Sequence, residues 1–261
     1  MTRGGDRKRV LILGGSVFQV PLIEHAKAQG DYVITADYLP SNPGHKISDE
    51  YHDVSTTDIP AVVALAERLN IDAVMTFGSD PALPAVSAVA ERLKLPGPAS
   101  DAVALLSDKS KFRALLNACG LPAPRHLSVG SDQLEEQSFQ AALGALVRPV
   151  IIKPVDSCGS KGISIVLTDD QLAEAFKHAL AHSRAGQLIA EEYLEGPQVH
   201  GDGFMMNGKL VHCYLGDHYF YTKTGNRIPQ ATVWPSIQSE QFISDVQWQV
   251  ELVTARSGYT D

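Results

Sequence analysis

Residues 149–162 read PVIIKPVDSCGSKG: a short apolar segment with one lysine, Lys153, and then a loop of small residues with a second, Lys161. A strand buries a lysine ammonium at low cost only where an anion or a carboxylate meets it. Loops of glycine, serine and cysteine let backbone N–H groups approach a ligand closely, and such concave loops suit phosphates. The stretch therefore predicts a strand and loop that hold a triphosphate. The alternative is a β-hairpin turn with two solvated lysines.

The loop does not follow the P-loop pattern. Gly-x-x-x-x-Gly-Lys-Ser/Thr is absent, and no helix-opening Lys-Ser follows the last glycine of the stretch. A phosphate loop of another kind is therefore expected, and the segments around it indicate which.

The segments that follow favour an antiparallel sheet. Residues 188–197, LIAEEYLEGP, form an apolar run that leads into acidic residues and a turn. Asn207 and Gly208 separate two strand-like runs, and this pair is a strong hairpin signal because a type I′ turn needs positive φ at both central residues. Residues 150–215 are therefore expected to be mostly antiparallel sheet, with one helix inserted at 169–183.

Another motif lies upstream of the lysine strand. Residues 107–113, SDKSKFR, predict a helix that begins at Lys109 with Ser107 or Asp108 as its N-cap. The two prolines of CGLPAP, residues 119–124, are expected to end this helix.

Together these motifs resemble the ATP-grasp superfamily of ATP-dependent ligases, and in particular proteins related to carbamoyl-phosphate synthase and phosphoribosylglycinamide synthetase. SDKSKFR with CGLPAP, the Lys153 strand with its loop, and EEYLEG at 191–196 occur in the family's order and spacing. The resemblance implies an α/β fold: an N-terminal Rossmann-like parallel-sheet (pre-ATP-grasp) domain at 1–98, followed by an incomplete α+β ATP-grasp domain at 99–261.

The resemblance also implies roles for the phosphate-binding residues. Lys109 and Lys153 would contact the ATP phosphates, with Lys153 near the adenine side. Lysine suits this role as a point-charge phosphate binder. The loop that closes over the β- and γ-phosphates would consist of Ser157, Gly159, Ser160, Lys161 and Gly162.

The nucleoside would lie farther along the chain. By the same resemblance, Glu191 would lie beside the nucleoside, and the backbone of Glu192, Tyr193 and Leu194 would pair with the adenine edge. Where the family usually places a ribose-binding carboxylate, this chain has Gln198, which can still hydrogen-bond a hydroxyl but carries no charge.

Magnesium is expected with ATP, but the family's ligands for it are not found. They are a Glu or Asp followed by a Glu-x-Asn, C-terminal to the hairpin, and no Glu-x-Asn occurs in the last fifty residues. No metal ligand is therefore assigned within this chain. The sequence resembles an ATP-grasp protein shortened before its metal-binding strands, so the Mg²⁺ ligands are expected beyond residue 261.

The activity that the resemblance implies is ATP-dependent ligation of a carboxylate to an amine or a thiol through an acyl-phosphate. Arg227 is the candidate for binding a substrate carboxylate or the acyl-phosphate. One alternative is a non-catalytic nucleotide-binding module that lacks the metal site. A second is an NAD-binding Rossmann protein.

The NAD alternative comes from the first hundred residues, which alternate between strand and helix patterns. The expected strands are 8–13, 32–36 and 73–77, and the expected helices are 20–29, 59–69 and 82–93. Gly14 and Gly15 follow the first strand, and Asp37 ends the second, where a partner of the NAD ribose would lie. The Gly-x-Gly-x-x-Gly fingerprint is nevertheless incomplete.

Two further expectations concern the loops of this region. Residues 38–58 read as a turn-rich loop whose histidines, His45 and His52, match no zinc spacing and are expected to be solvated. Gly78, Ser79 and Asp80 follow a strand at the sheet edge where α/β proteins bind ligands, so this edge is expected to touch substrate.

Composition narrows the class of protein. The net charge is −8 and no basic stripe is present, which argues against nucleic-acid binding. No run of 18 apolar residues occurs, and no membrane association is expected. The three cysteines, Cys119, Cys158 and Cys213, form no Cys-x-x-Cys pair, which favours a reducing cytoplasm. The expected partners are ATP, a small carboxylate or amine substrate and, by resemblance, a second copy of the chain.

Overall fold

The computed structural model describes residues 7–221 and 228–259. Two compact units divide the chain, one ending at Ala104 and the other beginning at Leu105. The expected domain boundary between residues 98 and 99 stays a prediction.

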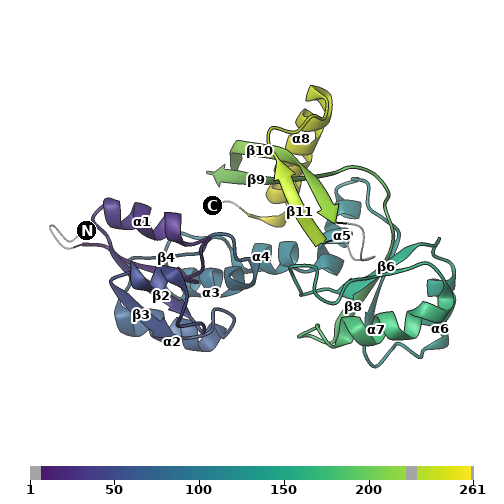
Figure 1. The fold of residues 1–261 in the computed structure, drawn as a ribbon, viewed down its shortest axis with the longest axis horizontal. Helices are drawn as coiled ribbons and strands as arrows, with labels where there is room; N and C mark the ends of the chain where they lie inside the picture. The colour runs from purple at the N-terminus through teal and green to yellow at the C-terminus, as the bar shows by residue number, and fades with distance from the viewer. Residues whose placement is uncertain (1–6, 222–227, 260–261) are drawn as a thin grey trace. The chain divides into compact units, whose positions relative to one another are not determined.

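The first unit is built on a parallel sheet (Figure 1). Its strands lie in the order β3-β2-β1-β4: β1 is Arg9–Leu13, β2 is Tyr32–Asp37, β3 is Glu50–Asp53 and β4 is Ala73–Met75. The helices are α1 (Val20–Ala28), α2 (Ile59–Leu69) and α3 (Leu83–Leu93), with short 3-10 turns η1 (Pro43–Lys46) and η2 (Asp80–Ala82), and α4 (Ser100–Ser107) contains the boundary with the second unit. The expected α/β alternation is confirmed.

Both faces of this sheet are buried. Leu11 and Leu13 of β1 pack in a cluster with Val62 of α2 and Val89 of α3. Ile12, which lies between Leu11 and Leu13, faces the other side of the sheet and packs with Ile23 of α1. A parallel strand covered by helices on both faces reads as a continuous apolar run, which explains why β1 is readable from the sequence.

The prediction of a loop over residues 38–58 is wrong in part, because the segment contains η1 and β3. Strand β3 pairs in parallel with β2 at the edge of the sheet, so its residues Glu50–Asp53 need no apolar run. The expectation of solvated histidines is also wrong for His45. Its ring packs 4.0 Å from that of Tyr51, and its Nδ1 lies 2.9 Å from Oγ1 of Thr35. Burial lowers the pKa of His45.

The second unit contains an antiparallel sheet with the order β5-β8-β6-β7. Its strands are β5 (His126–Gly130), β6 (Val150–Pro154), β7 (Ser164–Val166) and β8 (Gln187–Glu192). Helices α6 (Gln137–Gly144) and α7 (Leu172–Leu180), the latter preceded by η3 (Asp169–Gln171), pack on one face, where the ring of Phe139 lies 5.9 Å from that of Phe176. The expected helix at 169–183 is thus shorter and begins with a 3-10 turn.

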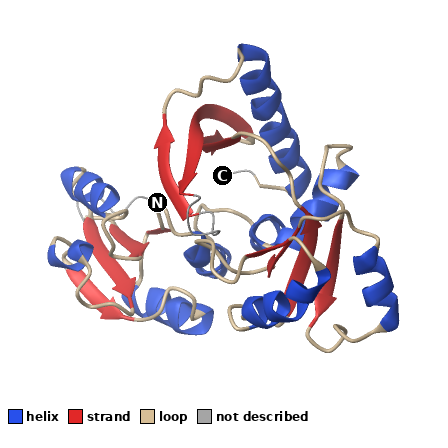
Figure 2. Cartoon of the chain, turned by 45° about the vertical axis from the view of Figure 1, so that its right-hand side comes forward, coloured by secondary structure: helices blue, strands red, loops and turns tan. Residues whose placement is uncertain are grey.

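A second antiparallel sheet follows, with the order β11-β10-β9. Its strands are β9 (Gln198–Met206), β10 (Lys209–Tyr221) and β11 (Ile228–Val233), and α8 (Glu240–Ser257) packs on β10. Figure 2 shows α8 as a long blue helix beside these red strands. Asn207 and Gly208 join β9 to β10 with φ values of 52° and 72°, which confirms the hairpin and the positive φ that a type I′ turn requires.

Helix α5 spans Lys109–Ala118, and Asp108 is its N-cap because the Asp108 carboxylate accepts from the N–H groups of Ser110 and Lys111. The prolines do not end it. The helix ends at a Schellman motif: Gly120, at φ 69°, donates to the Asn117 carbonyl, and Leu121 donates to that of Leu116. Among the described residues, none of the helices is long and apolar enough to cross a membrane.

Candidate functional site

The alternation of side chains along β6 and β8 creates the site. Val150 and Ile152 of β6 pack under α6 and α7, so Lys153 points to the other face of the sheet. Leu188 and Ala190 of β8 likewise pack under the helices, which puts Glu191 on the same face as Lys153. The Nζ of Lys153 lies 2.5 Å from Oε2 of Glu191. This carboxylate is the partner that a buried strand lysine needs.

Helix α5 supplies two more cations to the same place. Its N-cap positions Lys109 at the first helical residue, and Arg113 follows one turn later on the same side of the helix. Arg113 donates from Nε to Oε1 of Glu191 at 2.8 Å. Lys109 donates from Nζ to the Ser157 carbonyl at 2.6 Å, and the Lys109 N–H donates to the Val155 carbonyl. The start of α5 is therefore tied to the end of β6.

The electrostatics of this cluster favour an added anion. Glu191 is 3% exposed, and burial alone would raise the pKa of its carboxyl, but Lys153 and Arg113 hold that pKa below its ordinary value. Burial, and then repulsion by Lys153, lower the pKa of Lys109. Two cations thus contact one carboxylate and a third, Lys109, lies close enough to Lys153 to be repelled by it, so the excess positive charge matches what a polyphosphate would neutralise.

The loop after β6 has fixed ends and an exposed tip. Gly159, Ser160 and Gly162 have positive φ values of 65°, 59° and 73°. Ser157 donates from Oγ to the His182 carbonyl at 3.0 Å, which fixes the beginning of the loop. A Cβ on Gly162 would lie 2.8 Å from the His182 Cβ, which requires glycine at the end of the loop. Between them Cys158 to Lys161 are exposed.

Some hydrogen-bonding groups of the segment after β8 already have partners within the fold. The carboxylate of Glu192 accepts from Arg125 Nη1 and from the N–H of Val147, and its own N–H donates to the Arg125 carbonyl. The N–H of Tyr193 donates to the Pro149 carbonyl, whereas the Leu194 side chain is exposed. Gln198 is exposed at the first residue of β9.

The structure therefore brings together Lys109, Lys153 and Glu191 and places the loop of residues 157–162 beside them. Arg227 lies outside the described residues. Arg113 is the residue that sequence reasoning missed as part of the cluster. Its spacing of four from Lys109 on one helix was the available signal.

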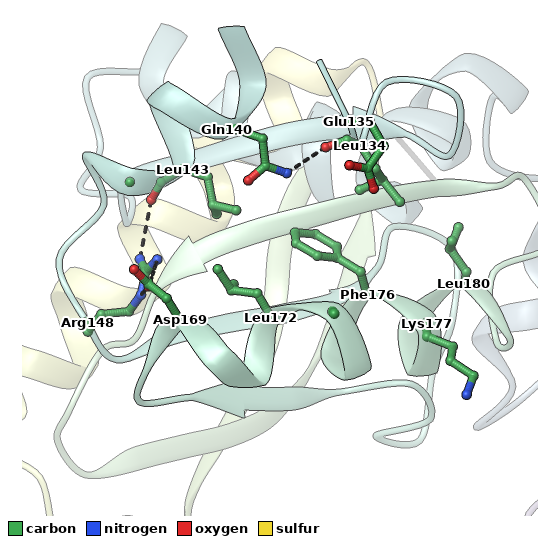
Figure 3. A pocket seen from close by; sticks show the side chains of 12 residues that line it. Leu134, Glu135, Gln140, Leu143, Arg148, Asp169, Leu172, Phe176, Lys177 and Leu180 are labelled. Atoms are coloured by element: carbon green, nitrogen blue, oxygen red, sulfur yellow. Dashed lines mark hydrogen bonds and ion pairs between the residues drawn. The ribbon is translucent and has the colours of Figure 1, made fainter. Parts of the chain in front are cut away.

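A groove between α6 and α7, with a volume of about 690 Å³, lies on the other face of this sheet (Figure 3). Several of its polar groups already bind groups within the fold. Arg148 pairs with Asp169 at 2.7 Å and donates to the carbonyls of Leu143 and Leu146, and Gln140 donates to the Leu134 carbonyl. The groove therefore offers a ligand few unused polar groups and is not the candidate site.

The first unit argues against the NAD alternative. The carboxylate of Asp37 accepts from the N–H of Gly15 at 3.2 Å and from Nδ2 of Asn42 at 2.9 Å. The ring of His45 lies against Gly15, where an added Cβ would come within 2.1 Å of it. The glycine and the carboxylate that would hold a dinucleotide are thus both used within the fold.

Among residues 7–221 and 228–259, no three His, Cys, Asp or Glu side chains gather in an arrangement that could hold a metal ion. The charged cluster fits the phosphates of a nucleotide, but no magnesium ligand can be named from the described side chains.

Comparisons with known proteins indicate the family that this chain resembles. Residues 108–202 match the family model described as carbamoyl-phosphate synthase L chain, ATP binding domain. The chain is 31% identical over 194 residues to a phosphoribosylamine–glycine ligase of Streptomyces coelicolor, covering 73% of this chain and 44% of the relative. It is 27% identical to a formate-dependent phosphoribosylglycinamide formyltransferase of Bordetella bronchiseptica, covering 72% and 46%. The chain thus spans about half the length of these curated relatives.

Solved structures show the same fold. The phosphoribosylglycinamide synthetase of Anaerococcus prevotii has a TM-score of 0.74 at 22% identity, covering 98% of this chain and 63% of that one. The biotin carboxylase domain of Hydrogenobacter thermophilus 2-oxoglutarate carboxylase, a dimer in complex with MgADP, ADP and bicarbonate, has a TM-score of 0.81 at 17% identity, covering 97% and 59%. The chain is thus a relative of the ATP-grasp ligases: its residues 108–202 match the ATP-binding domain of the carbamoyl-phosphate synthase L chain, and it has the fold of these proteins.

Proposed function

We propose that the protein carrying this chain is an ATP-dependent ligase that joins a carboxylate to an amine or a thiol. The γ-phosphoryl group of ATP passes to a carboxylate oxygen, which yields an acyl-phosphate and ADP. The amine or thiol then attacks the carbonyl carbon, and inorganic phosphate leaves with the bonding electron pair. The observation that carries this proposal is the pairing of Lys153 and Arg113 with the buried carboxylate of Glu191, together with Lys109, whose ammonium binds the carbonyl of Ser157 in the adjacent loop of small residues.

The residues take distinct roles in this proposal. Lys109 and Lys153 neutralise phosphate charge, and the N–H groups of the 157–162 loop approach the β- and γ-phosphates. Glu191 keeps Lys153 charged and oriented, and Arg113 holds Glu191 from the other side. The N–H groups of Glu192 and Tyr193 are used within the fold, so pairing with adenine through an N–H falls to Leu194. Gln198 remains the proposed ribose contact, and Arg227 the proposed contact to the substrate carboxylate.

Magnesium, which accompanies ADP in the biotin carboxylase domain of Hydrogenobacter thermophilus, supplies further neutralisation of phosphate charge when bound. The steps proposed above do not depend on any particular protein ligand of that ion. The same structural neighbour is a dimer, and a homodimer of this protein is part of the proposal, which light scattering would test.

The test separates binding from chemistry. A non-hydrolysable ATP analogue is titrated into the protein by calorimetry, and ADP release is then followed with a panel of carboxylates paired with amines or thiols. We expect analogue binding, and ADP release that requires both a carboxylate and an acceptor. Binding without ADP release for any pair would favour the non-catalytic nucleotide-binding module, and absence of binding would contradict both.

A further inference from the structure

His178 and His182 face each other at the C-terminal end of α7. His178 belongs to the last turn of α7, and His182 lies four residues later in the turn that follows the C-cap, Ala181. Their ring centroids are 4.9 Å apart, the ring planes lie at 82°, and both side chains are exposed. Two neighbouring exposed imidazoles of this kind can bind one transition-metal ion.

The Nδ1 atom of each ring is held by the protein. Nδ1 of His182 lies 2.9 Å from the His178 carbonyl, and because a carbonyl only accepts, this nitrogen carries the proton. Nδ1 of His178 lies 3.1 Å from Oγ of Ser164 on β7, whose hydroxyl can accept from it. With Nδ1 protonated, the lone pair of each neutral ring lies on Nε2. Metal-binding histidines typically have their second nitrogen anchored in this way.

The separation of the rings also fits one shared ion. An ion held at about 2.0–2.1 Å from each Nε2, with a tetrahedral angle between the two bonds, puts the two ring centroids roughly 5 Å apart. The observed centroid separation of 4.9 Å agrees with this value.

We propose that His178 and His182 form a two-histidine site for a divalent transition-metal ion such as Zn²⁺, Ni²⁺ or Cu²⁺. Imidazole nitrogens suit these ions, whereas Mg²⁺ prefers carboxylate, phosphate and water oxygens. Water completes the coordination, since the protein supplies two ligands. This site is separate from the charged cluster around Glu191, and it stands whether or not the protein is a ligase.

A metal ion here would act on the loop that follows β6. Ser157 donates to the carbonyl of His182, and Gly162 lies against the His182 Cβ, so both ends of the loop rest on this residue. An ion that links His182 to His178 stabilises the turn that follows α7, because it binds the ordered turn and not the opened one. Slower hydrogen exchange of residues 157–162 and 178–183 is the expected consequence.

A second pair of histidines could also bind the metal ion, so the experiment must distinguish the two pairs. His200 of β9 and His218 of β10 have ring centroids 5.3 Å apart. The variant His200→Gln/His218→Gln tests this pair. His25→Gln removes an exposed histidine from α1 and serves as the matched single-residue control.

The metal-free protein is titrated with Ni²⁺ and with Zn²⁺ by calorimetry. We expect one site, weakened at least roughly tenfold in His178→Gln and in His182→Gln, and weakened less in Ser164→Ala, which removes only the anchor. His25→Gln and His200→Gln/His218→Gln keep the site, and millimolar Mg²⁺ does not compete. Circular dichroism confirms that each variant is folded.

The proposal is overturned by any of three results. These are no binding up to about 1 mM metal, unchanged affinity in both His178→Gln and His182→Gln, or loss of binding only in the β9–β10 variant. Hydrogen exchange gives a second readout that needs no enzymatic activity. Equal exchange of the 157–162 loop with and without bound metal would contradict the coupling to the loop.

Discussion

Lys153 of β6 and Glu191 of β8 form a 2.5 Å ion pair on the sheet face opposite α6 and α7. Their strands are neighbours, with Ile151 directly opposite Glu191 and Lys153 opposite Ile189, so the pair is diagonal across the ladder. Arg113 binds the second oxygen of the same carboxylate. The pair links the stability of the second unit to its proposed nucleotide site.

Replacing Lys153 is expected to weaken ATP binding. In Lys153→Met, a phosphate partner disappears and Glu191 keeps Arg113, so ATP-analogue affinity should fall tenfold or more, about 1.4 kcal/mol. Calorimetric titration measures this. Lys177→Met is the matched control, because Lys177 is an exposed lysine on α7 and its removal should leave the affinity unchanged. Equal affinity for Lys153→Met and the wild type would remove Lys153 from the site.

Replacing Glu191 is expected to destabilise the fold. Glu191→Gln leaves Lys153 and Arg113, whose side chains are 12% and 20% exposed, without their shared counter-charge. Breaking a buried ion pair in this way costs about 3–5 kcal/mol, which urea denaturation at neutral pH would show. A loss below about 1 kcal/mol would mean that solvent already screens the cluster.

The same carboxylate predicts a pH dependence of stability. The folded pKa of Glu191 lies below the ordinary value of 4.5, chiefly because Lys153 offsets the effect of burial. Its stabilising contribution is therefore fully present above that ordinary value and is lost as the pH falls through the folded pKa. Urea midpoints measured from pH 7 downward should thus fall more steeply for the wild type than for Glu191→Gln. Parallel profiles would contradict this origin of the acid sensitivity.

Lys109 predicts proton uptake on nucleotide binding. Burial, with repulsion from Lys153, holds the pKa of Lys109 below its ordinary 10.5, and a bound phosphate would raise it again. At alkaline pH, between the folded pKa and the raised one, ATP binding should therefore take up a proton. Calorimetry in two buffers of different ionisation enthalpy measures the uptake, and Lys109→Met should abolish it. Undiminished uptake in that variant would assign the proton to another group.

Two glycines of the loop after β6 should respond differently to alanine. Gly159 and Gly162 both have positive φ, which costs alanine about 1–2 kcal/mol. Around Gly159 an added Cβ meets nothing within 4 Å, whereas at Gly162 it would lie 2.8 Å from the Cβ of His182 and 2.9 Å from the Cγ of Pro154. Gly162→Ala should therefore cost about 1–3 kcal/mol more than Gly159→Ala in thermal or urea unfolding. Equal losses of stability in the two variants would show that the loop at Gly162 can move away from His182 and Pro154.

Several elements could be predicted because short-range patterns specify them. Helix α2 has the expected bounds, Ile59–Leu69, since its apolar residues repeat on one face and Asp58 caps it. The turn at Asn207 and Gly208 follows from backbone sterics alone. Strands β3, β5 and β11 were missed. They pair at sheet edges, where one strand neighbour suffices and the apolar signal is weak.

The sequence by itself determined the order of the motifs, the strand that holds Lys153 and the need of that lysine for a partner anion. Only the tertiary structure decided that the partner is Glu191, and that Arg113 shares it. The physical reason is that strand register and helix docking join segments far apart in the chain. Burial then shifts the pKa values of the charged groups that are brought together. Local sequence propensity does not specify which groups those are.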